Sequence, residues 1–140
     1  MLGSGAMTNS IDDVCRKADV VMLVGSNPEE AHPVIGMQLR AAVERGCRLI
    51  VVDPRDIGLA AQADLHLKLR PGTNVAFANG IVNVLLAEGL YDAEFVRERT
   101  EGIEVLAATV RDYTPARVAE ICDIDQRDLV SAAKMYGGAG

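Results

Sequence analysis

The chain has few aromatic residues and no tryptophan. Aromatic side chains make up 4% of its 140 residues, whereas 49% of the residues are hydrophobic. A core of ordinary size for one domain must therefore be packed from Val, Leu, Ile and Ala. An aliphatic core of this kind is typical of a parallel β-sheet covered by helices.

Clustered positive charge and long hydrophobic runs are also missing. The formal net charge of -6 and a pI near 4.8 argue against a surface that binds phosphate backbones, so nucleic acid is excluded as a partner. The longest apolar run, residues 20–24, is too short to span a bilayer, and the N-terminus lacks the pattern of a signal peptide. We expect a soluble, cytoplasmic protein with no membrane partner.

Paired cysteines and a glycine fingerprint are absent as well. Cys15, Cys47 and Cys122 are far apart and form no C-x-x-C pair, which predicts buried free thiols and no disulfide framework, iron–sulfur site or zinc site. Neither His32 nor His66 has a nucleophile at a suitable spacing. The sequence therefore predicts no catalytic residue and no metal ligand within this chain. The motif G-x-G-x-x-G of ordinary NAD sites is also missing.

Alternating strand and helix patterns fill the first ninety residues. Hydrophobic periodicity predicts helices over residues 10–18, 33–45 and 74–88, and strands over residues 19–24, 48–52 and 65–69. Gly46 and Gly89 stand where left-handed helix ends are expected. A strand, helix and strand within about thirty-five residues match a βαβ crossover, so the strands should pair in parallel.

The pattern changes after Tyr91 to short helices. Asp92, Thr114 and Asp125 each stand at a predicted N-cap, and no further strand is visible. The predicted fold class is α/β: a Rossmann-like three-layer domain with a short parallel sheet over residues 1–90, followed by a small helical segment over residues 91–140.

All three predicted strands end in polar turns. Residues 25–30, 53–56 and 70–74 follow the first, second and third strands. In open parallel sheets, ligands bind outside the carboxyl ends of the strands. We therefore expect the three turns to converge on one ligand site.

Several residues in these turns suit a nucleotide. Asp53 stands where dinucleotide folds place an acid that binds ribose hydroxyls, although it could also simply open a turn before Pro54. Gly25 and Gly72 allow close approach of the backbone to a ligand. Thr73 and Asn74 lie where a helix N-terminus would offer free amides to a phosphate, or where they would only cap the helix.

Five segments of the chain, taken together, resemble segments of one known protein family. They resemble, in order, the molybdopterin oxidoreductase family, with the greatest similarity to catalytic subunits of formate dehydrogenases: GSGAMTNSI, VGSNPEEAHPV, VVDPRD, ADLHLKLRPGTN and LYDAEFVRERTEG. The resemblance implies one α/β domain of a much larger subunit, a domain that binds molybdopterin guanine dinucleotide. The residues that would form its cofactor site are Gly25, Asn27 and Glu30 in the first turn, Asp53, Pro54 and Arg55 in the second, and Gly72, Thr73 and Asn74 in the third.

The resemblance also implies what this chain does not carry. Family members have a cysteine cluster for an iron–sulfur centre and a Cys or selenocysteine bound to molybdenum or tungsten, and neither motif occurs here. Both belong to other regions of the parent enzyme. The implied partners are the remaining domains of the catalytic subunit and electron-transfer subunits.

Two other interpretations stay open at this point. The chain could be an assembly domain with a vestigial nucleotide crevice and a helical tail that docks a partner. It could also be a Rossmann-like domain that binds NAD or thiamine diphosphate in another enzyme, although the missing glycine fingerprint weighs against NAD.

Because the chain lacks these cysteine motifs, we expect it to be catalytically inert in isolation. Purified protein should contain no stoichiometric molybdenum, tungsten or iron by elemental analysis, and it should not reduce a viologen dye with formate. One equivalent of metal, or clear turnover, would overturn this prediction.

Overall fold

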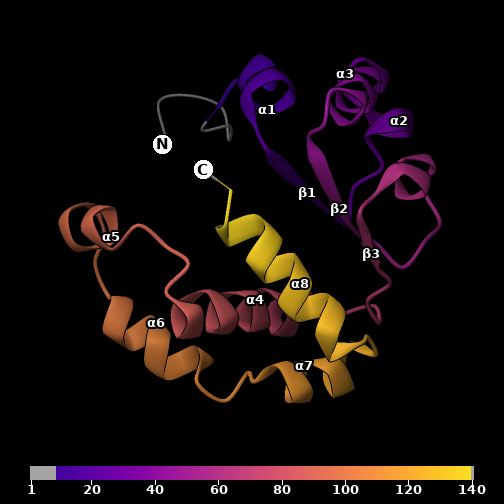
Figure 1. The fold of residues 1–140 in the computed structure, drawn as a ribbon. Helices are drawn as coiled ribbons and strands as arrows, with labels where there is room; N and C mark the ends of the chain where they lie inside the picture. The colour runs from indigo at the N-terminus through magenta and orange to yellow at the C-terminus, as the bar shows by residue number, and fades with distance from the viewer. Residues whose placement is uncertain (1–8, 140) are drawn as a thin grey trace, which may run out of the picture.

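The computed structural model of the chain describes residues 9–139 (Figure 1). Most of the first family-like segment, residues 3–8, lies outside this range. The elements run in this order: α1 (Ile11–Lys17), β1 (Val20–Val24), α2 (Pro28–Ala31), α3 (Pro33–Glu44), β2 (Arg48–Val52), the 3₁₀ helix η1 (Gly58–Gln62), β3 (Leu65–Leu67), α4 (Asn74–Glu88), α5 (Ala93–Arg99), α6 (Ile103–Val110), α7 (Pro115–Cys122) and α8 (Gln126–Gly137).

The three strands form one parallel sheet in the order β1-β2-β3. The predicted parallel pairing is therefore confirmed. β2 is the central strand, and its residues 49–52 are all buried. A run of apolar residues buried on both faces is what a central parallel strand requires.

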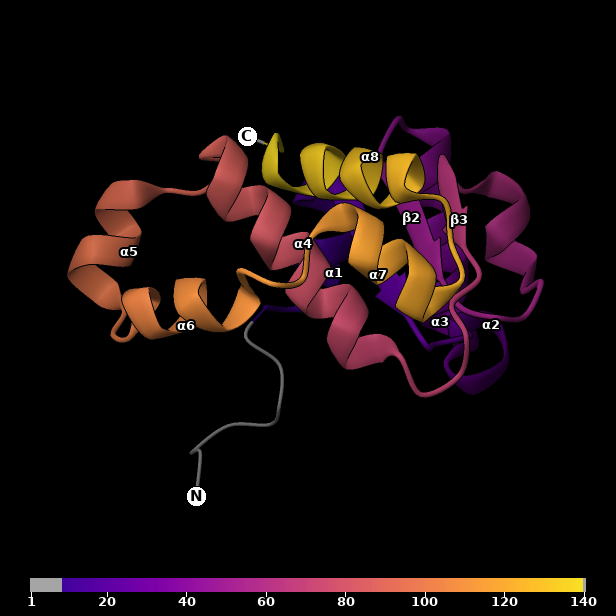
Figure 2. The same ribbon diagram turned by 90° about the horizontal axis from the view of Figure 1, so that it is seen from below.

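Helices cover both faces of the sheet, which confirms the predicted three layers. α1 and α3 pack with η1 on one face, in a core cluster that includes Cys15, Leu39, Leu49 and Leu59. α4, α7 and α8 pack on the other face, in a second cluster that includes Ile50, Phe77, Val118 and Leu129. Figure 1 shows the strands between α1 and α3 above and α4, α7 and α8 below; in Figure 2, seen from below, α7 and α8 lie in front of the strands.

The predicted helix ends agree with the observed caps. Asp92, Thr114 and Asp125 accept hydrogen bonds at the starts of α5, α7 and α8 from the backbone amides of Phe95, Arg117 and Arg127. Gly89 ends α4 with a φ of 68°, and Gly46 follows α3 with a φ of 103°. These positive angles favour glycine, because a Cβ atom is disfavoured there.

Two local predictions were wrong. The third strand was expected to reach Leu69, but β3 ends at Leu67. Beyond it the chain turns toward the junction of α7 and α8, where the amide of Arg70 donates to the carbonyl of Cys122 over 2.8 Å. The first polar turn is also partly helical, because Pro28 starts α2, and a proline is well suited to the first helical position.

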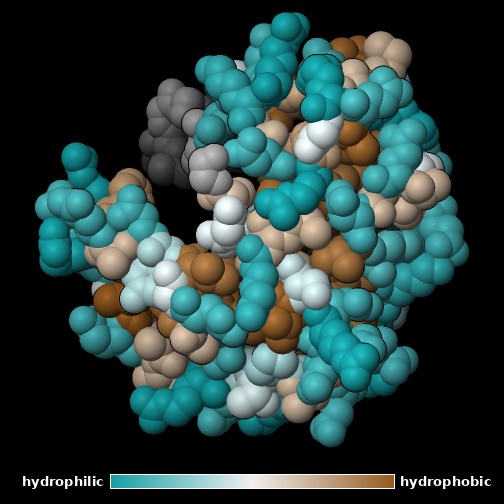
Figure 3. All heavy atoms as spheres, in the orientation of Figure 1, coloured by the Kyte–Doolittle hydropathy of each residue, from teal (hydrophilic) through white to brown (hydrophobic). Residues whose placement is uncertain are grey.

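The last fifty residues divide into two parts. α7 and α8 bury Val118, Cys122 and Leu129 in the core, against α4 and the sheet. The α5–α6 arm, residues 93–110, packs far less: α5 buries no residue and α6 buries only Val110. Figure 1 shows the arm extending from the end of α4, and Figure 3 shows apolar side chains among polar ones on this face. The domain boundary at residue 90 stays a prediction.

In the described part of the chain, every helix is too short or too polar to span a bilayer.

The core position of α8 predicts a large effect of truncating Leu129, whose side chain is fully buried at 0% exposure. Leu129→Ala should lower the free energy of unfolding by about 2 to 5 kcal/mol, because it removes buried methyl groups and leaves a cavity. Urea unfolding followed by circular dichroism measures this. Leu106→Ala on the α5–α6 arm is the matched control, because Leu106 is 42% exposed. Equal losses for the two variants would contradict the assignment of α8 to the core.

Candidate functional site

The carboxyl ends of the three strands lie on one edge of the sheet. Val24 pairs with Val52, and Val52 pairs with Leu67, so the strands end at the same level. The amide of Gly25 donates to the carbonyl of Val52 over 2.9 Å, and the φ of Gly25 is 60°. In Figure 1, the strand ends, α2 and the start of α4 lie on the same side of the molecule. This strand-end edge carries the predicted turns, residues 25–30, 53–56 and 70–74.

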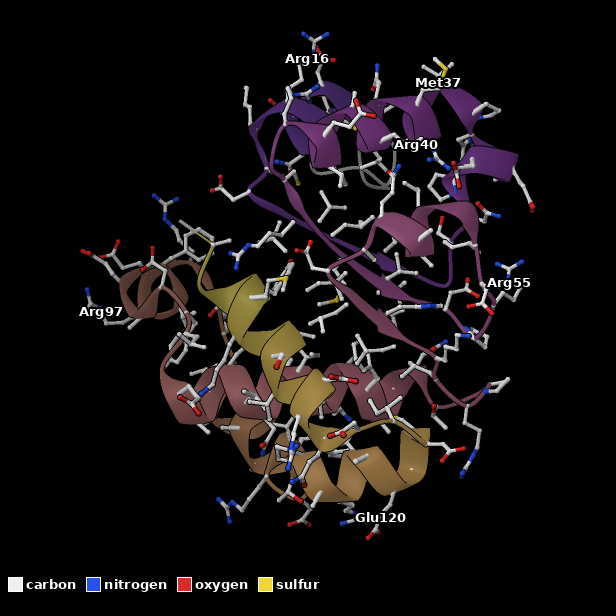
Figure 4. All side chains as sticks on the ribbon, turned by 45° about the vertical axis from the view of Figure 1, so that its right-hand side comes forward. Arg16, Met37, Arg40, Arg55, Arg97 and Glu120 are labelled. Carbon is white, nitrogen blue, oxygen red and sulfur yellow. The ribbon has the colours of Figure 1, made fainter. Side chains whose placement is uncertain are left out.

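Asp53 and Arg55 form the central ion pair of this edge. The Asp53 side chain is only 2% exposed, and its Oδ1 accepts hydrogen bonds from the backbone amide of Arg55 over 2.9 Å and from its Nε over 3.0 Å. Oδ2 accepts one from an outer guanidinium nitrogen over 3.0 Å. The Arg55 side chain as a whole is 61% exposed and extends outward in Figure 4. Asp53 thus opens the turn and also orients Arg55.

The charges of the pair stabilise each other. The hydrogen bond from the Arg55 side chain holds the pKa of the Asp53 carboxyl below its usual value of 3.8, although burial of the carboxyl opposes this. Asp53 in turn raises the pKa of Arg55, with a smaller contribution from the charge of Glu30. Glu30 belongs to the first turn and Arg55 to the second. The hydrogen bond from the Gly25 amide to the Val52 carbonyl shows that these two turns start side by side.

The two neighbouring glutamates of the first turn have different surroundings. Glu29 forms an ion pair with Arg40 of α3, and Figure 4 shows Arg40 beside α2. The Glu29 backbone packs closely on Gly36: a Cβ atom added to Gly36 would lie 2.9 Å from the Cα of Glu29. Glu30 is exposed. Glu29 therefore fixes α2 in place, which leaves Glu30 as the carboxylate that can meet a ligand.

Asn27 carries a polar atom without a partner. Its Oδ1 is buried and accepts no hydrogen bond from any described residue, although Asn27 stands at the N-cap of α2. Buried polar atoms in folded proteins nearly always have a partner. An orphaned oxygen in the first turn is compatible with a ligand that brings hydrogen-bond donors.

The third turn leads into α4. Gly72 has a φ of 87°, and Thr73 is the N-cap residue. The Thr73 hydroxyl donates to the carbonyl of Arg70 over 2.6 Å and makes no capping bond to the first amides of α4. Simple side-chain capping by Thr73 is thus not observed. The N-terminus of this fifteen-residue helix suits an anion, because its amides and its dipole both favour negative charge.

Two side chains of the β3 segment connect it to the second turn, and sequence reasoning missed both. His66 Nε2 lies 2.9 Å from the carbonyl oxygen of Asp53, and Lys68 Nζ lies 2.6 Å from Oδ1 of Asp56. The hydrogen bond and charge of Lys68 lower the pKa of Asp56, with a smaller contribution from His66. The alternation of His66 and Lys68 with leucines was visible in the sequence, but their partners were not.

The cysteines offer no reactive centre. Cys15 and Cys122 are buried as predicted, Cys47 is half-buried, and all three are free. Burial raises the pKa of the Cys15 and Cys47 thiols, so both are protonated at neutral pH. Residues 9–139 hold no group of three or more His, Cys, Asp or Glu side chains placed to bind a metal ion.

Comparison with known proteins assigns the family. A sequence model described as molybdopterin oxidoreductase matches residues 3–136. The chain belongs to the molybdopterin oxidoreductase family. Membership in this family implies a molybdopterin cofactor that carries molybdenum or tungsten.

Relatives match nearly all of the chain. The formate dehydrogenase subunit alpha of Methanocaldococcus jannaschii is 44% identical over 137 residues, which are 98% of this chain and 20% of that protein. Formate dehydrogenase H of Escherichia coli is 38% identical over 138 residues, which are 99% of this chain and 19% of that protein. The chain thus spans about a fifth of the length of these curated molybdopterin oxidoreductases.

A solved structure supports the same fold. Acetylene hydratase from Pelobacter acetylenicus superposes with a TM-score of 0.82 at 38% sequence identity, over 87% of this chain and 17% of that one. Molybdopterin oxidoreductases with two differently named activities therefore share this α/β unit.

The Asp53–Arg55 pair predicts a specific pH dependence of stability. Because the pKa of Asp53 is lowered in the folded state, the pair stabilises the fold above pH 3.8, and this stabilisation is lost as the pH falls through the lowered value. At pH 7, Asp53→Asn should lower the free energy of unfolding by about 1 to 2 kcal/mol, because it removes the carboxylate that accepts charge-assisted hydrogen bonds from Arg55, whose outer end is in solvent.

Urea unfolding of wild type and Asp53→Asn between pH 7 and pH 2 measures this difference. It should stay constant down to about pH 5 and shrink below that. Asp112→Asn, at an exposed residue between α6 and α7, is the control and should show no such difference. A constant difference across the whole range would rule out ionised Asp53 as its source.

Proposed function

We propose that this chain is a cofactor-binding domain of an oxidoreductase resembling formate dehydrogenase, and that its strand-end edge binds the guanosine diphosphate part of molybdopterin guanine dinucleotide. The observation that carries the proposal is the buried Asp53 carboxylate, which bonds the Arg55 guanidinium while most of the Arg55 side chain stays in solvent. The first turn on the same strand-end edge adds the orphaned Asn27 oxygen. Family membership supports molybdopterin as the cofactor class. Because relatives named formate dehydrogenase and acetylene hydratase both match this chain, we assign it a role other than substrate selection.

The residues of the edge fit the groups of a guanosine diphosphate. A guanidinium has five N–H donors, and Arg55 uses one from Nε and one from an outer nitrogen on Asp53, so its others are available to phosphate oxygens. The N-terminus of α4 after Thr73 offers backbone amides to the same anion. Gly25 and Gly72 let the chain approach a phosphate or sugar closely.

Carboxylate and amide groups suit the nucleoside. Glu30 is exposed and can accept hydrogen bonds from the N–H groups of guanine, and the Asn27 oxygen can accept one more. Asp53 Oδ2 accepts a single hydrogen bond from Arg55, so one ribose hydroxyl could share that oxygen. Pro54 sets the turn between Asp53 and Arg55. Contact of each of these residues with the cofactor stays a prediction.

The cofactor, when bound, supplies redox chemistry at its molybdenum or tungsten atom. The part assigned to this chain is to hold and orient the nucleotide end. Iron–sulfur and metal-ligand cysteines belong, in this proposal, to other regions of the parent enzyme. Formate as substrate, electron-transfer subunits as partners and a cytoplasmic location also stay predictions.

One observation favours the alternative of an assembly domain. The short α5–α6 arm exposes three large apolar side chains, those of Phe95, Val105 and Leu106. Exposed apolar surface of this kind can mark an interaction site. An arm that docks another domain would be compatible with cofactor binding at the opposite end. Titration with GDP distinguishes a cofactor-binding domain from a domain that serves only in assembly.

Titration of the chain with GDP, followed by amide chemical shifts, tests the proposed site. Shifts should change together at residues 25–30, 53–56 and 72–74 and should spare the residues after Tyr91. The dissociation constant should be on the order of 0.1 to 1 mM, because one domain leaves much of the ligand in water. NAD and thiamine diphosphate should give weaker effects. Changes confined to one turn, or scattered over the helical segment, would refute the site.

Arg55→Ala should weaken GDP binding by about tenfold, because a charge-assisted hydrogen bond is lost. Arg97→Ala is the matched control, since Arg97 is similarly exposed, at 72%, but lies on α5 at the other end of the molecule (Figure 4). Its affinity for GDP should equal that of the wild type. Equal weakening in both variants would point to nonspecific attraction of the anion.

A further inference from the structure

The second turn, residues 53–56, is held at both of its ends, by His66 of β3 and by Lys68 directly after β3. The parallel ladder between β2 and β3 ends at the pair Val52–Leu67, one residue before Asp53. At that point the His66 imidazole reaches the carbonyl oxygen of Asp53 over 2.9 Å. A carbonyl oxygen only accepts hydrogen bonds, so His66 Nε2 carries the proton. The side chain thus continues the attachment of the two strands beyond the ladder.

The other end of the turn is held through Asp56. Lys68 Nζ lies 2.6 Å from Asp56 Oδ1, and His66 Nδ1 lies 3.9 Å from the same oxygen. Arg55 lies between these two attachments. Its backbone and its guanidinium both bind Asp53, so the direction of the guanidinium depends on the main chain of this turn.

We propose that His66 is a positioning residue of the nucleotide site: its Nε2–H bond to the Asp53 carbonyl fixes the turn from which Arg55 reaches the ligand. This inference rests on the proposed function. His66 does not itself contact the nucleotide. Its side chain is 17% exposed and belongs to neither core cluster, so its loss should move the turn without unfolding the domain.

Two substitutions separate the hydrogen bond from the imidazole ring. The amide nitrogen of Gln is three bonds from Cβ, as His Nε2 is, whereas the amide nitrogen of Asn is only two bonds away, as Nδ1 is. His66→Gln can therefore still donate to Asp53, and His66→Asn cannot reach it. His32→Asn, the same change at the exposed histidine between α2 and α3, is the matched control.

The experiment is a GDP titration of these three variants, followed by amide shifts. His66→Asn should bind GDP about three- to tenfold more weakly, the range for one neutral hydrogen bond, and His66→Gln should restore most of the affinity. His32→Asn should match the wild type. Thermal unfolding of both variants at position 66 should be cooperative, with midpoints well above the temperature of the titration, so that unfolded protein does not cause the difference in affinity.

A measurement without nucleotide distinguishes this inference from the proposed function. A long-range proton–nitrogen spectrum of the free wild-type chain should show His66 with its proton on Nε2, and backbone relaxation should show residues 53–56 more mobile in His66→Asn than in His66→Gln. If the wild type binds GDP at all three turns and both variants bind equally well, the positioning role is wrong and the proposed function stands. If the wild type does not bind GDP, the proposed function fails. The positioning role of His66 is rejected as well if its proton is on Nδ1, or if residues 53–56 are equally mobile in His66→Asn and His66→Gln.

Discussion

The parallel register of β1, β2 and β3 is the constraint on which the strand-end edge depends. β2 is buried along residues 49–52 and is flanked by the charged residues Arg48 and Asp53, so a shift of one residue would bring a charged side chain into the buried part of the sheet. Because the register is fixed, the three strands end level at Val24, Val52 and Leu67, and each following turn starts from the same edge. The two helical layers that cover the sheet hold this register, since each buries one face of β2.

The end of the central strand carries a buried carboxylate, that of Asp53, whose charge needs a partner. An isolated charge in a protein interior is strongly unfavourable, and Asp53 avoids that cost through three hydrogen bonds from Arg55. The arrangement places the negative charge inside and the positive charge outside. The edge therefore presents the positive Arg55 side chain to solvent, although the chain as a whole carries a net charge of -6.

Local signals made most of the fold predictable from the sequence. β2 and α4 have the predicted bounds, and the caps at Asp92, Thr114 and Asp125 follow from side chains that bond amides two or three residues away. Contacts between distant residues were not predictable. Glu29 meets Arg40 eleven positions later, and His66 meets Asp53 thirteen positions earlier. The family-like segments predicted the residues of the candidate site. Only the structure shows the bond between Asp53 and Arg55 and the ion pair by which Glu29 supports α2.

The α5–α6 arm is attached to the rest of the chain by few buried contacts. α5 buries no side chain, and α6 is attached mainly through Val110 and through Asn83 of α4, which donates to the Val110 carbonyl over 3.0 Å. The free energy needed to open this segment locally is therefore small compared with that of unfolding the core. Its amide hydrogens should exchange with solvent before those of α4 or β2, and proteases should cut there first. Over evolutionary time, the same property lets the segment accept insertions and deletions without any change at the opposite end of the sheet.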